Sequence, residues 1–517
     1  MRRQSARLCR RPVRQRPNPG GAGSAAGFAG KGCTMSPEMT YRLILALVMG
    51  LLFTELLYWK RPRPVTAFSG KEKHRYTPYF AYWLLPGFLF LIVCFLPLML
   101  PRGGGSSLLG LLFQTFLHLA LYNSLLLLLL PLLRRFLQPQ TCVVLWLLPN
   151  YLYLCMSSEN FQLDRPLLIL RLPAAAIRIG CWVWAAGFAV VLGWKIFSHL
   201  RFRHRILKDA LAAADPSTAR LWEELRQWAG YSSKRLPLLV SPAVSTPLSI
   251  GLFPSTIRVV LPQRDYTQRE LDLILRHELV HIGRGDSTAK FFLTFCTALC
   301  WFNPLMWAAM KQGSEDLELS CDQEVLDGSD EEGRREYARL LLRTTGEQAG
   351  FTTCLSASAA SLRRRLQRVL HPVRRFICGI SAGLAAFGLV MTFGWATLAY
   401  DITGQEVFFP GDTREHWSIS SIGLTDAGNC QATDPEALMD YLAGLELECL
   451  AGQYTFPRQE RELSIFLSGP DGVRFLSIRD DVAQSFPLGT ASYEGGNRYL
   501  VAGGVNWTYI ESLLNPE

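Results

Sequence analysis

The sequence has no CxxC pair and no regular spacing among its thirteen cysteines, which excludes a zinc ribbon and a disulfide scaffold. It also has no internal repeat. Polar residues are too few for one soluble domain, because 49% of the 517 residues are hydrophobic and leucine-rich runs recur along the chain. We therefore expect an α-helical membrane protein with several spans and with soluble parts.

Each end of the chain lacks one kind of charge. No acidic residue precedes Glu38, and residues 1–38 combine eight Arg or Lys with a Gly/Ala/Ser-rich stretch, which is typical of a disordered extension. This stretch could also be translated from upstream of a true start at Met35 or Met39, and no signal-peptidase site stands out. Residues 401–517 hold 18 acidic residues, six arginines and no lysine, which predicts a separate small domain.

Six segments have the composition of a membrane span, which needs about 20 largely apolar residues. They are Tyr41–Trp59, Tyr79–Leu100, Leu108–Leu133, Cys142–Met156, Ala174–Phe197 and Phe376–Tyr400. The fourth is short and contains Pro149 and Asn150. A re-entrant or interfacial segment is therefore the alternative to a full crossing at that point.

The net charge of +10 is carried by basic clusters beside the apolar segments. We interpret it as membrane topology and expect no direct binding of nucleic acid. Six crossings then place the N-terminus outside, residues 199–375 inside and the acidic tail outside. The basic run from Arg363 to Arg375 precedes the last span and is interpreted as a membrane-edge anchor.

The acidic tail has the pattern of a small α+β domain. Leu463–Leu467 and Val473–Ile478 alternate apolar and polar residues around the turn Gly469-Pro470-Asp471-Gly472, which predicts a hairpin. Asp434–Leu445 is predicted to be a helix. Cys430 and Cys449 are either a disulfide pair or two free buried thiols.

The stretch LRHELVHIGRGD, residues 275–286, follows a helix start signal. Thr267 and Glu270 have the spacing of a capping box, which predicts a helix from that point to about Gly283. The stretch then lies in the last part of this helix.

His277 and His281 are four residues apart in that stretch, and Glu278 directly follows the first histidine. On a helix the two imidazoles share one face and can bind one zinc ion, while Glu278 can act on a water as general base. The alternative is an apolar helix with two hydrogen-bonded histidines.

A second polar pair lies in SEDLELSCDQEVL, where Glu318 and Asp322 are again four residues apart. Glu318 would complete a set of two histidines and one glutamate, and Asp322 could accept a hydrogen bond from the outer nitrogen of a ligating histidine. A solvated acidic face is the alternative for this segment. Asp286 either caps the next helix or supports a ligand from behind.

The apolar segment Ala289–Met310 between these motifs is long enough to cross a membrane. A crossing would put the two motifs on opposite sides, which one zinc site forbids. We therefore expect a buried or membrane-dipping helix that is interrupted near Asn303-Pro304.

The motifs HELVH and ELSCD resemble those of the membrane zinc metallopeptidases of the BlaR/MecR antirepressor type, which pair HExxH with a later ExxCD. The resemblance covers about Tyr41 to Tyr400 and is strongest from Leu239 to Leu342. Further matching pieces are Gly251-Leu252-Phe253, Val259-Val260-Leu261-Pro262, Arg284-Gly285-Asp286 and Trp301-Phe302-Asn303-Pro304-Leu305. The resemblance implies zinc ligands at His277, His281 and Glu318, with Glu278 as base.

The resemblance also implies a gluzincin-like domain in which an edge strand holds the substrate backbone. The candidate residues are Pro247, Leu248, Ser249 and Ile250, and half of a structural hairpin is the alternative. Tyr337 and Arg276 are offered as oxyanion donors, but the sequence positions neither. Cys321 is interpreted as a packing residue, and His118 as a core histidine.

One departure from the best-known members concerns the sensor. Those proteins carry a large extracellular penicillin-binding domain with an SxxK serine, whereas the tail here is short and has no lysine. The SxxK match at Ser287–Lys290 lies inside the peptidase region and is treated as chance. The sequence therefore predicts no β-lactam sensing by that route.

We expect a zinc endopeptidase of a bacterial cell membrane that responds to an outside cue. Its protein substrate would be cytoplasmic, by resemblance a winged-helix repressor. A broad quality-control protease and a non-proteolytic zinc-binding scaffold are the alternatives, and a homodimer stays open. The expected parts are the extension 1–38, a membrane region of about five spans at 39–198, a cytoplasmic α+β zinc peptidase domain at 199–375, a last span at 376–400 and an extracellular α+β domain at 401–517.

Overall fold

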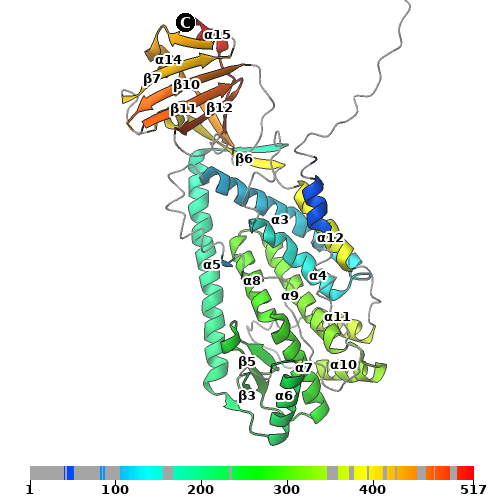
Figure 1. Ribbon diagram of the computed structural model, residues 1–517. Coiled ribbons are helices and arrows are strands. Elements are labelled where there is room, and N and C mark those ends of the chain that lie inside the picture. Colours follow the sequence, from blue (N-terminus) through cyan, green and yellow to red (C-terminus); the bar gives the residue numbers. More distant parts are fainter. Residues whose placement is uncertain are drawn as a thin grey trace, which may run out of the picture.

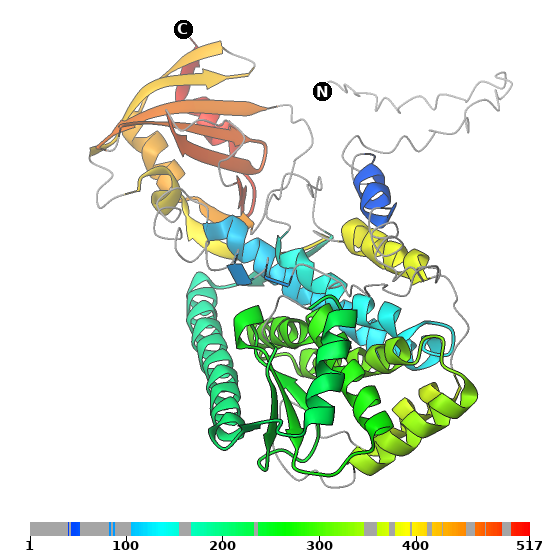
Figure 2. The ribbon, with the colours of Figure 1, turned by 60° about the horizontal axis from the view of Figure 1, so that its bottom comes forward.

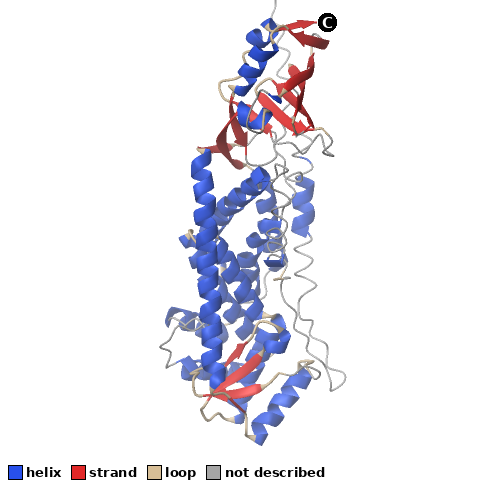
Figure 3. Ribbon diagram, turned by 90° about the vertical axis from the view of Figure 1, so that its left-hand side faces the viewer, coloured by secondary structure: helices blue, strands red, loops and turns tan. Residues whose placement is uncertain are grey.

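A computed structural model shows an elongated molecule with a large β-sheet at one end, a small β-sheet at the other and helices between them (Figures 1 and 3). The residues that it describes are 40, 43–51, 82–83, 86–87, 105–154, 167–231, 236–345, 359–371, 378–392, 395–410, 416–425, 428–450, 461–470, 472–488 and 498–516. The extension 1–38 and most of the first two predicted spans lie outside the described residues.

Two helices in the described part are long and apolar enough to cross a membrane. They are α3, Gly105–Leu133, with its apolar part at Leu112–Leu133, and α5, Ala174–Lys208. Both coincide with predicted spans. The 35 residues of α5 make a rod of roughly 52 Å at 1.5 Å per residue, and no residue of its apolar window is fully buried. This helix connects the two ends of the molecule (Figure 1).

The fourth predicted span is a short interrupted segment. It consists of the helix α4, Pro139–Leu147, and the 3-10 turn η2, Leu148–Leu154. The interruption falls at Pro149, which cannot donate a backbone hydrogen bond. Nearly all of α4 is buried, so its apolar composition reflects burial inside the protein, in keeping with the re-entrant alternative.

The last predicted span was too long at its C-terminal end. The apolar helix α12 is Cys378–Thr392, and residues from Ala396 onward form the strand β6, Ala396–Thr403. Residues 396–399 are buried in the large sheet. A short apolar run that is buried as a strand cannot be distinguished from a helical span by composition alone, which explains the error.

The large sheet has ten strands in the order β1-β6-β9-β13-β12-β11-β10-β7-β8-β14. Their bounds are β1 Leu168–Leu172, β6 Ala396–Thr403, β7 Ser418–Leu424, β8 Gly428–Ala432, β9 Glu446–Leu450, β10 Glu462–Gly469, β11 Gly472–Arg479, β12 Val482–Pro487, β13 Arg498–Val501 and β14 Leu514–Pro516. Three short helices accompany them: α13 Gly404–Phe408, α14 Pro435–Ala443 and α15 Trp507–Ser512.

Both structural predictions for the tail are confirmed. The strands β10 and β11 pair antiparallel with Gly469 opposite Gly472, and the helix α14 is capped by the Asp434 side chain. Cys430 and Cys449 are both buried free thiols. The tail is thus mainly a β-sheet region, with the helices as minor elements.

The strand β1 attaches this sheet to the membrane helices from outside the tail sequence. It pairs in parallel with β6, and Arg171 Nε donates to Glu448 Oε1 at 2.8 Å. Two residues later α5 begins, where the Ala174 backbone N–H donates to Asp401 Oδ1 at 2.7 Å. The sheet is therefore connected both to the N-terminus of α5 and, through β6, to the chain that follows α12.

The opposite end holds a four-stranded sheet in the order β2-β3-β5-β4. Figure 2 brings this end forward and shows the small sheet beside α5. The bounds are β2 Leu211–Ala212, β3 Leu238–Ser241, β4 Leu248–Ile250 and β5 Arg258–Pro262, with the helices α6 Pro216–Trp228, α7 Gln268–Arg284, α10 Glu331–Thr345 and α11 Ala359–Leu370. Apolar faces of α6, α7 and α10 form one core with β3 and β5.

Between α7 and α10 the chain makes a helical hairpin, α8 Asp286–Leu299 and α9 Pro304–Val325. The break falls at the predicted place, because Asn303 Oδ1 accepts from the Leu305 N–H at 3.0 Å and caps α9. The apolar side chains of α8 belong to one buried cluster with side chains of α3, α4, α9 and α12, and the helix also contacts α5. The predicted buried helix is thus confirmed.

The tip of this hairpin contacts α5 deep within the apolar region. Trp184 Nε1 donates to Leu299 O at 2.8 Å, and Trp301 Nε1 donates to Trp184 O at 3.2 Å. The Trp301 ring lies so close to α5 that a Cβ at Gly187 would be 2.1 Å from it. Gly187 is therefore required for the contact.

Gly187→Ala is expected to lower the free energy of unfolding by about 1–3 kcal/mol, because overpacking against Trp301 outweighs the better helix propensity of alanine. Gly193→Ala on the same helix, where a Cβ meets nothing within 4 Å, is expected to be neutral or to stabilise by up to about 1 kcal/mol. Thermal unfolding of the detergent-purified full chain checks both. Equal effects of the two variants would contradict the proposed role of Gly187.

Candidate metal centre

The helix α7 carries the HELVH motif and is fixed at both ends. The capping box is confirmed, since Thr267 Oγ1 accepts from the Glu270 N–H at 3.3 Å and Glu270 Oε2 accepts from the Thr267 N–H at 2.9 Å. At the other end Gly285 has φ 70°, a left-handed conformation that glycine adopts at little cost. The buried face of α7 packs on the core of the small sheet, which orients the two histidines toward α9.

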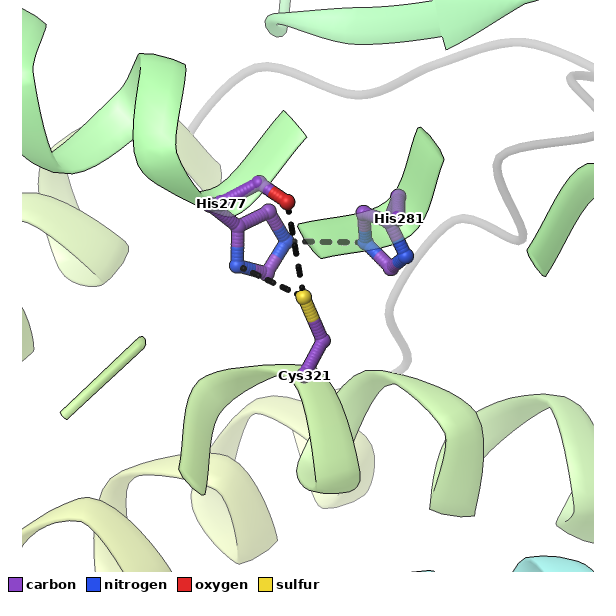
Figure 4. A group of neighbouring side chains, drawn as sticks. All are labelled: His277, His281 and Cys321. Atoms are coloured by element: carbon purple, nitrogen blue, oxygen red, sulfur yellow. Dashed lines mark hydrogen bonds between the residues drawn. The ribbon is translucent and has the colours of Figure 1, made fainter. Parts of the chain in front are cut away.

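The two imidazoles meet at their Nε2 atoms. His277 Nε2 and His281 Nε2 are 3.0 Å apart, and the rings are nearly perpendicular, at 87°. Figure 4 shows both rings on the side of α7 that faces α9. Two facing nitrogens at this distance share one hydrogen bond at most, or bind one cation.

Glu318 on α9 brings a carboxylate oxygen to the same point. Its Oε2 lies 3.7 Å from His277 Nε2 and 3.6 Å from His281 Nε2. Ligand atoms that surround a tetrahedral zinc at about 2.0–2.1 Å are separated by about 3.3 Å. The three separations of 3.0, 3.6 and 3.7 Å lie on both sides of that value, so these residues fit a zinc ion.

Cys321, one turn further along α9, lies beside the same histidines. Its Sγ is 3.5 Å from His277 Nδ1 and 3.5 Å from the His277 carbonyl oxygen (Figure 4). With His277 and His281 it forms a group that could hold a metal ion. The sequence favoured a packing role for Cys321, yet the structure provides two candidates for a third ligand, Glu318 and Cys321.

The geometry favours Glu318 over Cys321. The glutamate oxygen faces the Nε2 atoms of both histidines, whereas the sulfur faces the Nδ1 side of His277. That Nδ1 already lies 2.9 Å from the Tyr337 hydroxyl. A thiol that contacts both a ring and a carbonyl is accounted for as a packing and hydrogen-bonding neighbour.

The outer nitrogen of each histidine has a polar partner. His281 Nδ1 lies 2.6 Å from Asp286 Oδ2. Tyr337, on α10, lies 2.9 Å from His277 Nδ1 and donates its hydroxyl to Asp322 Oδ1 at 2.7 Å. Such contacts fix the ring orientation and leave Nε2 available for a metal.

The two proposed supporting residues, Asp286 and Asp322, contact the histidines in different ways. Asp286 is the first residue of α8 and directly follows its N-cap residue, Gly285. Its side chain faces His281, and Arg284 Nη2 donates to the same carboxylate at 2.6 Å. Asp322 lies 3.6 Å from His277 Nδ1, with the Tyr337 hydroxyl as the closer partner of the ring.

Two cations beside the centre were not predicted. Arg365, on α11, donates from Nε and Nη2 to the two oxygens of Asp322, each at 2.7 Å. Its Nη1 is 3.7 Å from Glu318 Oε2. Lys290 Nζ donates to Glu318 Oε1 at 3.0 Å. The only sequence signals were positions in the chain: Lys290 lies between the two motifs, and Arg365 lies in the basic run.

Three arginines of that basic run make contacts within the protein, and the membrane-edge interpretation of the run stays a prediction. Arg365 contacts Asp322, Arg364 forms a short ion pair with Glu315, and Arg368 donates to the Arg134 carbonyl. The helix α11 packs on α9, which brings Arg364 and Arg365 to acidic partners and Arg368 to a backbone carbonyl. Arg363 is exposed, and Arg374 and Arg375 lie outside the described residues.

The cluster is electrostatically coupled. Burial would lower the pKa of His277, but the Cys321 sulfur and the Glu318 carboxylate raise it to about 9. Burial would raise the pKa of Glu318, yet Lys290 and His281 hold it well below its usual range. The carboxylate is thus already ionised, as a metal ligand must be, and a bound metal would replace protons on the histidines.

Glu278 and the edge strand lie next to this centre. Glu278 is 5% exposed, and in the described part of the chain its carboxylate has no recorded hydrogen bond or ion pair. The strand β4 is at the edge of the small sheet, antiparallel to β5, and contacts α7. Pro247 immediately precedes β4, and Gly251, with φ 130°, follows it.

Three other residues of interest are occupied elsewhere. Arg276 donates to Asp272 at 2.9 Å and stacks over the Trp228 ring, while the Tyr337 hydroxyl is committed to Asp322 and His277. His118 is buried, with its two ring nitrogens 2.7 Å from Gln114 O and 2.8 Å from Thr392 O. The core interpretation of His118 is therefore confirmed, and the oxyanion role stays open.

Comparison with known proteins shows which family this part of the chain resembles. Residues 171–369 match the family described as BlaR1 peptidase M56. A curated relative, the regulatory protein BlaR1 of Bacillus licheniformis, is 27% identical over 194 residues, which cover 37% of this chain and 32% of that protein. The match therefore spans about a third of the relative, and the family resemblance inferred from the two motifs is confirmed.

Glu318→Gln and Cys321→Ser separate the two candidates for the third ligand. We expect Glu318→Gln to lose bound zinc, because the neutral amide is a poor ligand, and Cys321→Ser to keep a full equivalent. Zinc in the purified full-length variants, measured by plasma mass spectrometry, decides between them. Loss of zinc in Cys321→Ser alone would assign the sulfur instead.

Asp286→Asn is expected to weaken zinc binding about 10–100-fold, because His281 loses an ionised partner at Nδ1. Competition with a zinc chelator measures the affinity. Glu332→Gln, an exposed change on α10, is the matched control and is expected to have no effect. An unchanged affinity in Asp286→Asn would contradict the supporting role.

Proposed function

Residues 171–369 form a peptidase region of the BlaR1 M56 family, and on that premise we propose that the protein is a membrane-embedded zinc endopeptidase of a bacterial signalling system. The observation that carries the proposal is the convergence of His277 Nε2, His281 Nε2 and Glu318 Oε2 within 3.7 Å of one another. A scaffold without turnover would need the ligands but not Glu278 beside them.

The proposed chemistry is hydrolysis of a peptide bond. A zinc ion held by His277, His281 and Glu318 would supply Lewis-acid polarisation of the substrate carbonyl and activation of water. Glu278, one residue further round α7 than His277, takes the proton of the attacking water. The same carboxylate then passes that proton to the leaving amine.

The remaining polar residues position this machinery. Asp286 and Tyr337 hold the two rings with Nε2 toward the metal, and Lys290 holds the other oxygen of Glu318. These contacts restrict rotation of all three ligands before metal binds. Positions that are fixed in advance cost little reorganisation during the reaction.

We assign substrate binding to the edge strand β4, with Pro247, Leu248, Ser249 and Ile250 as the contacting residues. One side of β4 is paired with β5, and its other side is the end of the sheet. An extended peptide could add there as a further strand. A purely structural hairpin is the competing interpretation, since the same geometry joins β4 to β5.

The proposed topology puts the peptidase end in the cytoplasm and the large sheet outside. Support comes from Arg134 and Arg135 after α3 and from Arg201, Arg203 and Arg205 at the end of α5, because basic residues mark the cytoplasmic side. All of them lie toward the peptidase end of their helices. The roughly 52 Å of α5 exceed the 30 Å of a hydrocarbon core, so one helix can reach both sides.

The proposed signal runs from the large sheet to the peptidase. The sheet is attached to α5 and follows α12, so a ligand that changes the sheet acts on two membrane helices. The substrate would be a cytoplasmic regulatory protein, and a winged-helix repressor is the leading candidate. A broad quality-control protease would have the same centre but a wider range of substrates.

Glu278→Gln is expected to keep zinc and to lose cleavage by at least about 100-fold, because the general base is removed while the ligands stay. Mass spectrometry of new protein termini, in cells that express the wild type or the variant, measures both the loss and the substrates. Glu332→Gln is the surface control and should cleave normally.

The pattern of cuts distinguishes the functions. A few Glu278-dependent cuts, with a DNA-binding repressor among them, support the signalling peptidase, whereas many scattered cuts favour quality control. Bound zinc with no Glu278-dependent cut would contradict the peptidase proposal.

A further inference from the structure

A cavity of about 430 Å³ lies where the end of α3 meets α4, α9 and α11. We call it the basic pocket, because four arginines line it. They are Arg134, Arg135, Arg364 and Arg368. Its apolar wall includes Leu127, Leu130, Trp146 and Leu319. The pocket therefore combines a cationic side with a hydrophobic side at the peptidase end of an apolar helix.

The positive charge of the basic pocket is only partly balanced. Arg134 Nη2 donates to Asp316 Oδ2 at 2.7 Å, and Arg364 forms a short ion pair with Glu315. Neither Arg135 nor Arg368 forms an ion pair within the described part of the chain, although Asp316 also acts electrostatically on Arg368. Four arginines thus face two carboxylates, and two positive charges remain.

Two arginine donors in the basic pocket also lack partners. Arg134 Nε and Arg368 Nη1 are buried and have no hydrogen-bond acceptor among the described residues. Buried donors without acceptors are unfavourable. Asp316 Oδ1 is a buried acceptor in the same situation, and a water molecule can donate to it. An anion with several oxygens would satisfy the two arginines and neutralise the excess charge.

The apolar wall of the basic pocket indicates which class of anion suits it. Pro131 lines the basic pocket and is exposed, and on α3 it lies one turn from Leu128, whose exposed fraction is 76%. The mouth of the pocket thus continues onto an exposed apolar face of a candidate span. Free inorganic phosphate would use the arginines but not this face, whereas a phospholipid uses both.

We infer that the basic pocket binds the phosphate headgroup of an anionic phospholipid, with an acyl chain along the exposed face of α3. The inference rests on the membrane placement proposed above, but not on peptidase activity. Basic pockets between helices at the cytoplasmic surface suit such headgroups.

The bound headgroup would also stabilise α11. Arg364 and Arg368 belong to that helix, and between them lies Arg365, which contacts Asp322 and approaches Glu318 of the metal centre. Without an anion, the unbalanced arginines on α11 and at the end of α3 repel each other. The lipid therefore favours the position of α11 in which Arg365 reaches the centre.

Native mass spectrometry of the detergent-purified full chain tests the inference. The probes are phosphatidylglycerol and phosphatidylcholine with the same acyl chains, and a bound adduct is expected to be retained only with phosphatidylglycerol. Arg135→Gln should weaken that binding about fivefold, the effect of one arginine near a headgroup. Arg205→Gln on α5, an equal loss of charge at an exposed residue outside the pocket, should leave it unchanged.

A second variant distinguishes an effect on lipid binding from an effect on folding. Gln367 lines the basic pocket and is exposed, so Gln367→Glu adds a negative charge without removing a contact. It should weaken phosphatidylglycerol binding at least as much as Arg135→Gln, with unchanged thermal unfolding in phosphatidylcholine. Equal retention of both lipids, or equal effects of Arg135→Gln and Arg205→Gln, would overturn the inference.

A competition arm distinguishes the source of the phosphate. Inorganic phosphate and glycerol 1-phosphate in millimolar excess are expected not to displace phosphatidylglycerol, because they lack the acyl chain. Displacement by either one would identify a site for a free anion and overturn the assignment to lipid.

Discussion

Two imidazole nitrogens 3.0 Å apart on α7 and a carboxylate oxygen on α9 impose the constraint that shapes the rest of the molecule. Both helices must reach one point from the same side, although an apolar segment long enough to span a membrane separates their motifs. The chain satisfies this with the hairpin of α8 and α9, which enters the apolar region and returns. Gly187 permits the contact of the hairpin tip with α5, because the Trp301 ring occupies the space that a side chain at position 187 would need. The metal centre is thus held by helices that pack within the proposed membrane region.

The second layer around the centre is a set of balanced charges. Asp286 pairs with Arg284, Asp322 with Arg365, and Glu318 with Lys290. Each pair is buried or partly buried, so removal of one partner would leave an uncompensated charge inside the protein. The cations come from three different helices, α7, α8 and α11. The packing of these helices and the charge balance at the centre therefore depend on each other, because displacement of any one helix leaves a buried carboxylate without its cation.

Local signals made much of this predictable from the sequence. The capping box of Thr267 and Glu270, the helix break at Asn303-Pro304 and the hairpin turn after Gly469 each depend on residues a few positions apart, and the structure confirms all three. The spacing within HELVH and ELSCD likewise identifies residues that the fold brings together. Patterns of this kind involve only residues that lie close together in the sequence.

Contacts between distant segments were not predictable in the same way. Tyr337 and Arg365 reach the centre from α10 and α11, and nothing in their local sequence distinguishes them from other helix residues. The strand β1 precedes α5 by one residue and joins a sheet whose other strands begin at Ala396. Residues 396–400 have the composition of the end of a span, because a buried strand and a lipid-facing helix are equally apolar. Only tertiary packing distinguishes these alternatives.

The position of α11 suggests how the two ends of the molecule are linked. On one side α11 carries Arg365, which holds both oxygens of Asp322 and lies near Glu318. On the other side the chain runs from Leu370 to α12 and on to β6, which also pairs with β1 at the start of α5. A shift of α12 relative to α5 can therefore act on α11, which precedes α12 in the chain. If it reaches α11, the Arg365 contact is the first to change, since a two-point hydrogen bond tolerates little displacement. The positions of Asp322, Tyr337 and His277 would then change too, because Asp322 accepts a hydrogen bond from the Tyr337 hydroxyl, and that hydroxyl contacts His277 Nδ1.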